Sequence, residues 1–234
     1  AKACPIIDGI VTLMDLGPST LALAGQKTPD WMHGRPLLCK TGEGEINYRD
    51  YVLGMRDRLD SRYEMVRSVR DQRFRYQRNY YPHLPFKPHE DFEFNAPILK
   101  KWVELARAGE LTGPQAQLNL RFKPIEELYD SENDPHMIHN VIDDPQYAAV
   151  GKRMRKRLKD WTPETRDLGL LDETETLARA ESHDSPWALG QSLDTYKRIR
   201  TTAHPPVNRK APVPHLLDHL NTASCPPLQR PATP

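Results

Sequence analysis

The chain has 234 residues, with 33 Lys and Arg against 32 Asp and Glu, so its formal net charge is +1. Because the positive and negative charges nearly balance, the chain as a whole does not attract a polyanion. Nucleic-acid binding would therefore have to rest on local patterning. The hydrophobic content is 38%, and no apolar run approaches the roughly 18 residues of a membrane span, which excludes an integral membrane protein. The three cysteines, Cys4, Cys39 and Cys225, form no CxxC pair and indicate no redox compartment.

The first predicted element is a helix. Apolar residues from Asp8 to Ala24 repeat at helical spacing, with Pro18 bending or restarting the helix and Gly25 as its natural stop. Asp15 interrupts the apolar stretch, and the opening residues carry little positive charge, so we do not interpret it as a signal segment. We expect a buried helix, followed by a turn-rich connector.

Residues 63–81 alternate apolar and charged positions, with "RDQR" at 70–73 where a short turn would join two strands. This pattern predicts a β-hairpin. Its arginines and aromatic residues could bind single-stranded nucleic acid, but a net charge near zero favours an ordinary sheet with a buried aromatic face and a solvated arginine face.

Downstream, the spacing predicts an amphipathic helix over 95–111, a short strand around Glu127 to Tyr129, and a helix from about Pro145 to Trp161. The predicted fold class is therefore α+β, with a small antiparallel sheet and packed helices. After about residue 172 the chain is rich in Pro, Ser, Thr and Ala. Periodic pieces remain only around Tyr196 to Ile199 and at 213–220, so we expect much of this part to be loosely held.

The segment "GMRDRLDSRYE" at 54–64 alternates charges of opposite sign. Guanidinium groups bind sulfate, phosphate or carboxylate in a bidentate manner, and the interleaved carboxylates could orient them. A surface ion-pair network is the other reading, and the pattern alone favours it. The histidines form no HExxH or comparable metal pair, and no nucleophile motif such as GxSxG is present.

Three segments, in order, carry a resemblance to a known family. They are "GIVTLMDLGPSTLALAGQKTPDWMHGRPLL", "RYEMVRSVRDQRFRYQRNYYP" and "EELYDSENDPHMIHNVIDDPQY". Together they resemble the C-terminal portion of sulfatases over about residues 5–172. The branch indicated is the bacterial sulfatases akin to N-sulfoglucosamine sulfohydrolase, which "WTPETRD" at 161–167 also fits.

The resemblance implies the C-terminal subdomain of an α/β, alkaline-phosphatase-like fold, in an enzyme that hydrolyses sulfate esters or sulfamates. It implies a calcium ion and a formylglycine made within a C/S-x-P-S-R motif. The sequence contains no such motif, so no catalytic or metal-binding residue is assigned here, and the chain alone is expected to be inactive. The implied partners are a sulfated small molecule or glycan and an N-terminal sulfatase domain, with no nucleic acid and no membrane.

We therefore predict three regions. Residues 1–45 would be the last helix and connector of the large sulfatase domain, 46–172 the C-terminal subdomain, and 173–234 an extended tail that could begin a helical-repeat region. The predicted substrate-binding residues are Arg56, Asp57, Arg58 and His83. The alternative function is a non-catalytic module for sulfated glycans, or an inactive remnant. The family implies a periplasmic, extracellular or lysosomal location, while the chain itself indicates none.

Overall fold

The computed structural model describes residues 9–37, 48–59, 62–87 and 90–203. The chain divides into two compact units, Ala1–Asp172 and Glu173–Pro234. The first unit contains a sheet with several helices, whereas the described part of the second unit is helical. None of the described helices has the length and hydropathy of a membrane span.

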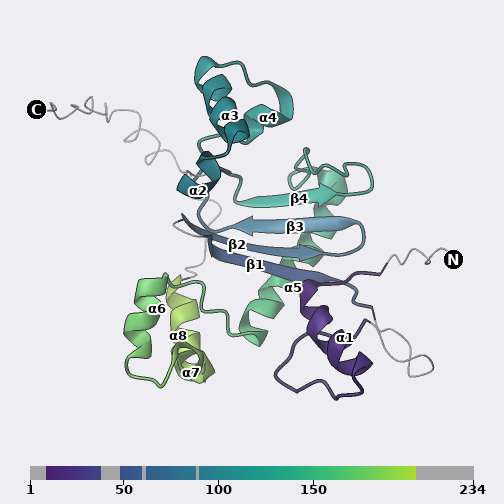
Figure 1. Cartoon of the computed structure of the whole chain (residues 1–234), viewed down its shortest axis with the longest axis vertical. Coiled ribbons are helices and arrows are strands. Elements are labelled where there is room, and N and C mark those ends of the chain that lie inside the picture. The colour runs from purple at the N-terminus through teal and green to yellow at the C-terminus, as the bar shows by residue number, and fades with distance from the viewer. Residues whose placement is uncertain (1–8, 38–47, 60–61, 88–89, 204–234) are drawn as a thin grey trace, which may run out of the picture. The chain divides into compact units, whose positions relative to one another are not determined.

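In the first unit, four strands form an antiparallel sheet in the order β1-β2-β3-β4 (Figure 1). The strands are β1 (Val52–Leu59), β2 (Arg62–Arg70), β3 (Phe74–Asn79) and β4 (Glu126–Asp130). Asp71 closes the turn between β2 and β3, because its Oδ1 accepts from the backbone N–H groups of Arg73 and Phe74 at 3.0 and 2.6 Å. The hairpin predicted for 63–81, the strand near Glu127 and the α+β class are confirmed, whereas the pattern did not predict β1.

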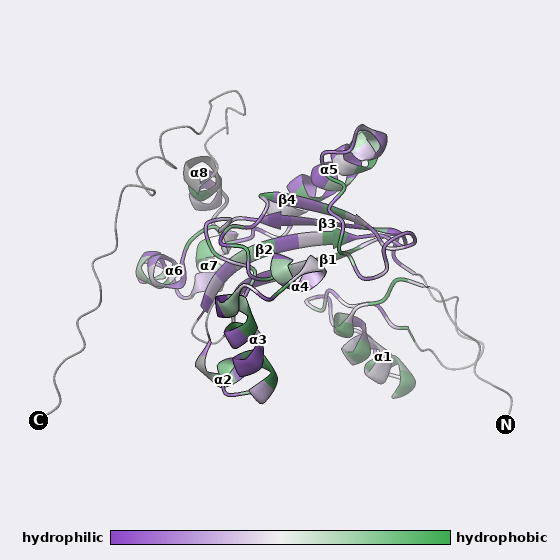
Figure 2. Ribbon diagram, turned by 90° about the horizontal axis from the view of Figure 1, so that it is seen from above, coloured by the Kyte–Doolittle hydropathy of each residue, from purple (hydrophilic) through white to green (hydrophobic). Residues whose placement is uncertain are grey.

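The core lies between the sheet and helix α5 (Ala148–Glu164), which lies along one face of the sheet in both views (Figure 1, Figure 2). The buried residues of this cluster are Val69, Tyr76, Leu128, Met154 and Leu158. Burying each such apolar side chain contributes roughly 1.5–3 kcal/mol. The short helix η2 (Pro145–Tyr147) leads into α5, and Asp144 caps it by accepting from the N–H of Gln146 at 2.8 Å. The predicted helix near 145–161 is confirmed.

The two faces of the sheet differ in chemistry. Val69 pairs with Leu53 and Tyr76, and Tyr76 pairs with Leu128, so these four residues form one row across the sheet. The row packs toward α5, and we name this side the α5 face. Next to it, a second row lies on the other side, because successive residues alternate between faces. That row is Gly54, Ser68, Gln77 and Glu127, and we name its side the polar face.

The N-terminal element is a 3-10 turn, η1 (Leu13–Asp15), followed by α1 (Leu16–Leu23). Asp15 is fully buried and holds this segment by accepting from the N–H of Arg35 at 2.8 Å and pairing with Arg49 at 2.7 Å. The apolar side chains around it are largely exposed, with Leu13 at 84% and Leu16 at 57%. The helix was predicted correctly, but the prediction that it is buried is wrong for the described residues.

Between β3 and β4 lie α2 (Asp91–Phe94), α3 (Pro97–Ala108) and α4 (Gly113–Gln117). Pro97 occupies the first turn of α3, and Gly109 ends it in the left-handed conformation with φ 73°. The amphipathic helix predicted for 95–111 is confirmed.

The second unit contains α6 (Glu173–Ala180), α7 (Pro186–Gln191) and α8 (Leu193–Ala203), with consecutive helices in contact. Ser185 caps α7 by accepting from the N–H of Ala188 at 3.1 Å. These helices occupy the part of the chain expected to be loosely held, and α8 contains the periodic piece around Tyr196. The piece predicted at 213–220 lies outside the described residues. The regional boundaries and the helical-repeat region stay predictions.

Candidate functional site

The side chain of Arg67 organises the sheet around a buried charge. It is fully buried on β2, and its guanidinium meets Asp167, three residues beyond the last residue of α5, with Nε–Oδ2 at 2.7 Å and Nη2–Oδ1 at 2.9 Å. Asp57 of β1 pairs with the same guanidinium at 2.7 Å. Burial lowers the pKa of Arg67, but the hydrogen bonds and charges of Asp167 and Asp57 outweigh it and leave that pKa raised.

This finding corrects one expectation. The hairpin was expected to carry a solvated arginine face, but Arg67 is fully buried and Arg62 is 8% exposed. Arg62 faces Glu93 at 3.4 Å and Glu90 at 3.9 Å. Carboxylates from distant parts of the chain neutralise both arginines, so each can be buried.

The segment after α5 approaches β1 closely. A Cβ on Gly169 would lie 2.0 Å from Nη2 of Arg67 and 2.5 Å from Oδ1 of Asp57. Only a glycine therefore fits against this ion-pair cluster without displacing it. The backbone N–H of Gly169 also donates to Oδ1 of Asp167 at 3.0 Å, which fixes the carboxylate that binds Arg67.

The predicted site residues of β1 lie at an irregularity in the strand. The register shifts between Arg56 and Arg58, because Arg56 pairs with Val66 whereas Arg58 pairs with Tyr63. Val66 and Tyr63 are three positions apart on β2 and so lie on opposite faces. Arg56 and Arg58 therefore project to different sides of the sheet.

Each of the two arginines has its own neighbour. Arg56 forms an ion pair with Glu64, and its side chain is 44% exposed. The guanidinium of Arg58 lies 5.4 Å from the ring centroid of Tyr63, as in a cation–π contact. Arg67 supports the backbone at the irregularity by donating from Nη1 to the carbonyl of Arg56 at 3.2 Å.

His83 follows β3 and lies beside an aromatic side chain. Its ring centroid is 5.7 Å from that of Tyr81. Burial raises the pKa of Tyr81, and the charges of Asp172 and Asp57 raise it further. Within the described segments, no direct contact joins His83 to Arg56, Asp57 or Arg58.

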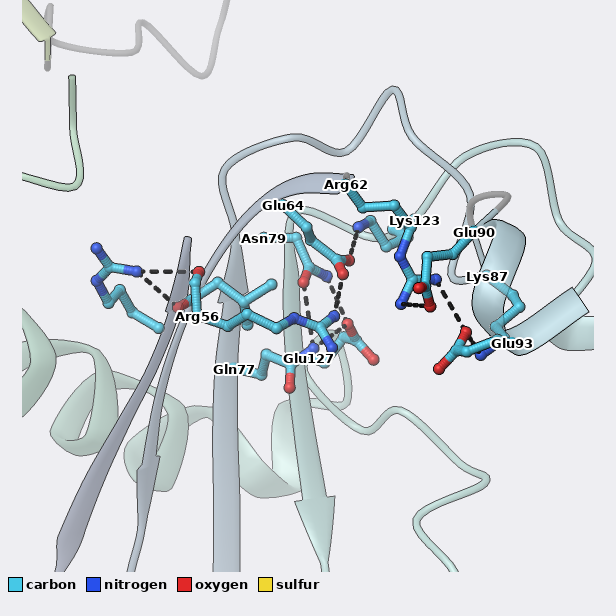
Figure 3. A network of polar contacts seen from close by, with 12 residues as sticks. Arg56, Arg62, Glu64, Gln77, Asn79, Lys87, Glu90, Glu93, Lys123 and Glu127 are labelled. Atoms are coloured by element: carbon cyan, nitrogen blue, oxygen red, sulfur yellow. Dashed lines mark hydrogen bonds and ion pairs between the residues drawn. The ribbon is translucent and has the colours of Figure 1, made fainter. Parts of the chain in front are cut away.

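The polar face carries a network of charged and neutral groups (Figure 3). Glu64 accepts from both Arg56 and Lys123, and the Lys123 side chain is only 1% exposed. Two cations therefore converge on one buried carboxylate. This arrangement is the ion-pair network that the 54–64 pattern favoured, extended by a lysine from far along the chain.

A second part of this network surrounds Glu127, which is 2% exposed. Its carboxylate accepts from the side-chain amides of Asn79 at 2.5 Å and Gln77 at 3.2 Å, and from the hydroxyl of Tyr129. Burial and the hydrogen bond to Glu127 raise the pKa of Tyr129 well above its usual range. Neutral donors, rather than cations, satisfy this buried carboxylate.

The sequence pattern missed the residues that hold the site together, namely Arg67, Lys123 and Asp167. One available signal was "WTPETRD", the segment that fits the resemblance and ends on Asp167. Across the described residues, no group of three or more His, Cys, Asp or Glu side chains could hold a metal ion. The substrate-binding role of Arg56, Asp57, Arg58 and His83 stays a prediction.

No protein-family model matches the chain. An ulvan-active sulfatase of Formosa agariphila is 30% identical over 168 residues, covering 72% of this chain and 28% of that protein. The human N-sulphoglucosamine sulphohydrolase is 28% identical over 173 residues, covering 69% of this chain and 34% of that protein.

Among solved structures, a 2-O GAG sulfatase aligns with a TM-score of 0.46 and 21% identity, over 70% of this chain and 27% of that chain. The chain thus spans 28% and 34% of the length of the two curated relatives described above.

Proposed function

Because the chain is related to the sulfatases over about 70% of its length, we propose that it supplies the C-terminal subdomain of a sulfuric ester hydrolase. The reaction would be hydrolysis of a sulfate ester or sulfamate. The observation that carries the proposal is the 30% identity over 168 residues to a protein described as an ulvan-active sulfatase. Those comparisons confirm the resemblance carried by the three sequence segments.

The fold agrees with this proposal. Two of the three segments correspond to the strands at the centre of the first unit: the hairpin segment forms β2 and β3, and "EELYD" forms β4. The four-stranded sheet therefore consists mainly of the residues that carry the resemblance, with β1 added at its edge.

Arg56, Asp57, Arg58 and His83 are the residues that we propose for substrate recognition. The side chain of Arg56 is partly exposed beside Glu64, and Asp57 is held by Arg67 at 2.7 Å. A guanidinium that is fixed by a carboxylate still offers N–H groups to the oxygens of a sulfate. The expected substrate is thus a sulfated small molecule or glycan, in agreement with the name of the human relative, N-sulphoglucosamine sulphohydrolase.

The calcium ion and the formylglycine of a sulfatase do not fit onto the described residues of this chain. No group of three His, Cys, Asp or Glu side chains stands together there, and no cysteine or serine lies in a C/S-x-P-S-R motif. We propose that both belong to a separate N-terminal sulfatase domain, where calcium would hold the sulfate and the hydrated aldehyde would act as the nucleophile. No step of hydrolysis is assigned to residues of this chain.

The test compares the 234-residue chain with a longer protein in which a C/S-x-P-S-R domain precedes it. We expect calcium-dependent hydrolysis of an aryl sulfate by the longer protein and none by the chain. Arg56→Ala in the longer protein should raise KM for a sulfated glycan with a smaller change in kcat. Calcium-dependent turnover by the 234-residue chain would contradict the proposal.

A glycan-binding module without catalysis remains the second candidate, favoured by the partly exposed Arg56. It predicts salt-sensitive retention of the chain on immobilised heparin, lost in the variant Arg56→Ala/Arg58→Ala. If the longer protein is inactive but this retention is observed, the module replaces the enzyme as the function. No retention at low salt would exclude the module.

A further inference from the structure

The polar face contains two arginines directly opposite each other. Arg70 of β2 and Arg75 of β3 are Cα partners in the antiparallel register. Residues paired in this way point to the same face, with Cβ atoms about 4.5–5.5 Å apart, and like charges at such positions destabilise a sheet. Two guanidinium groups side by side therefore require an explanation.

A second arginine pair in the same two strands shows how this chain otherwise resolves the repulsion. Arg67 and Arg78 are also Cα partners, on the α5 face. Arg67 pairs with Asp167 and Asp57, both at 2.7 Å, and Arg78 pairs with Glu126 at 3.2 Å. Each guanidinium of that pair is neutralised by at least one carboxylate.

The pair on the polar face has no such carboxylates in the described segments. Arg70 is exposed and makes no ion pair there. Arg75 donates only to neutral acceptors, the side-chain oxygen of Gln77 at 3.3 Å and the sulfur of Met137 at 3.8 Å. The two positive charges are therefore not compensated by protein groups in that part of the chain.

Among the described residues, the carboxylates near Arg70 and Arg75 form no ion pair with either arginine. Asp71 follows Arg70 directly, but its oxygens accept from the turn N–H groups and pair with Arg153 at 2.7 Å. Glu127 accepts from Asn79, Gln77 and Tyr129. Asp50, two residues before the Val52 that pairs with Arg70, makes no ion pair with either arginine.

The remaining neighbours of the arginine pair on the polar face are small or neutral. Ser68 and Gln77 are Cα partners and occupy the adjacent row, and Tyr129 lies opposite Arg75. The Ser68 hydroxyl can donate a hydrogen bond to an oxyanion lying over the two guanidinium groups. The surface thus offers the Ser68 hydroxyl beside the two guanidinium groups, and no carboxylate among the described residues forms an ion pair with either guanidinium.

We propose that Arg70 and Arg75 form a binding site for a sulfate group of a sulfated glycan. Two guanidinium groups present paired N–H donors that match the geometry of a tetrahedral oxyanion, and the bound charge removes their mutual repulsion. The oxyanion site stands on the register and charges described above, while the identification of its ligand as a sulfated glycan rests on the proposed function.

The experiment is calorimetric titration of the 234-residue chain, at low ionic strength, with a heparin-derived hexasaccharide. A desulfated hexasaccharide that retains its uronate carboxylates separates sulfate recognition from carboxylate recognition, and inorganic phosphate tests a free oxyanion. The test variant is Arg70→Gln/Arg75→Gln. The matched control, Arg107→Gln/Arg121→Gln, removes two exposed arginines that form no ion pair within the described segments.

We expect the sulfated hexasaccharide to bind and the desulfated one to bind much more weakly. The test variant should lose about tenfold or more in affinity, while the control changes about twofold or less. Arg70→Lys/Arg75→Lys should also weaken binding, because lysine keeps the charge but not the planar donor pair. If the double Gln variant fails to fold by circular dichroism, each single Gln variant should weaken binding about threefold or more.

Equal losses of affinity in the test and control variants would show that binding is general charge attraction, which would contradict the proposed site. No binding by the parent chain, or tighter binding of phosphate or of the desulfated hexasaccharide, would overturn it as well. The experiment measures binding and not turnover. An inactive longer protein would therefore contradict the proposed hydrolase function but not the proposed binding site. A failure of binding here would leave the hydrolase proposal standing.

Discussion

Arg67 and Asp167 lie 100 residues apart in the chain and form a bidentate ion pair inside the first unit, with Nε–Oδ2 at 2.7 Å and Nη2–Oδ1 at 2.9 Å. Arg67 is fully buried and Asp167 is 6% exposed. The pair joins the centre of β2 to the segment that follows α5. It also supports β1, because the same guanidinium binds Asp57 and the carbonyl of Arg56.

The first prediction concerns this pair. Asp167→Ala leaves a buried guanidinium with only part of its compensation, so the free energy of unfolding should fall by about 3–5 kcal/mol. Urea unfolding of the 234-residue chain measures the change. Asp160→Ala is the matched control, because Asp160 pairs with Lys156 on the exposed side of α5 and solvent screens that pair, so its loss should cost much less. Equal costs for the two variants would contradict a structural role for Asp167.

The second prediction concerns acid. Burial raises the pKa of Glu126, but hydrogen bonds from Arg155 and Tyr76 outweigh it and lower that pKa from its ordinary value of 4.5 to about 2. A carboxyl whose pKa is lower in the folded state stabilises the fold above the unfolded pKa. That contribution, about 3 kcal/mol, is lost as the pH falls from about 4.5 through 2.

Urea unfolding at pH 7, 4.5 and 3 checks this pH dependence. Glu126→Gln should be less stable than the parent at pH 7 and should lose less stability on acidification. Glu104→Gln serves as the control for removal of a surface carboxylate, since Glu104 pairs with the exposed Lys101 among the described residues. A parent whose stability does not fall between pH 4.5 and 3 would rule out this contribution.

The third prediction separates repulsion from ligand binding in the Arg70 and Arg75 pair. Without ligand, Arg70→Gln should raise the free energy of unfolding at low salt by about 0.2–1 kcal/mol, because it removes one of two like charges on paired strands. The gain should shrink at 1 M salt, where screening acts within about 3 Å. Arg78→Gln should instead destabilise, since Arg78 pairs with Glu126 at 3.2 Å. A loss of stability in Arg70→Gln at low salt would show that the two charges do not repel.

The fourth prediction concerns the apolar side chains around α1. Leu13 is 84% exposed and Leu16 is 57% exposed, so the isolated chain should bind a hydrophobic dye and tend to aggregate. Leu13→Ser/Leu16→Ser should lower dye fluorescence and light scattering. Leu177→Ser, at a single exposed leucine of α6, provides a control for loss of one apolar side chain. A parent chain that melts sharply as a monomer and binds no dye would refute this expectation.

Much of the fold could be predicted from periodicity. The alternation over 63–81 indicated the β2–β3 hairpin, and the spacing of Ile98, Trp102 and Leu105 indicated α3. Both depend on local pattern, because each element buries or exposes side chains with its own period. Strand β1 was missed, because its sequence "GMRDR" has charges where a strand pattern needs apolar residues and its register shifts between Arg56 and Arg58.

The candidate site was less predictable, because burial of a charge depends on partners far along the chain. Arg67 looks like any other polar position in an alternating strand, and its burial depends on carboxylates elsewhere in the chain, Asp167 and Asp57. The same holds for Lys123, which reaches Glu64 from 59 residues away. The alternating charges at 54–64 indicated an ion-pair network, yet they could not indicate that Arg56 and Arg58 lie on opposite faces.

The 100-residue separation of Arg67 and Asp167 also sets the order of events during synthesis. At about 5–20 residues per second, a ribosome adds Asp167 roughly 5–20 seconds after Arg67. During that interval Asp57 is already available to Arg67, but the bidentate partner is not, so we expect full burial of the guanidinium only after Asp167 has been added. We therefore expect the sheet to acquire its buried ion pair late, when nearly the whole first unit has been synthesised.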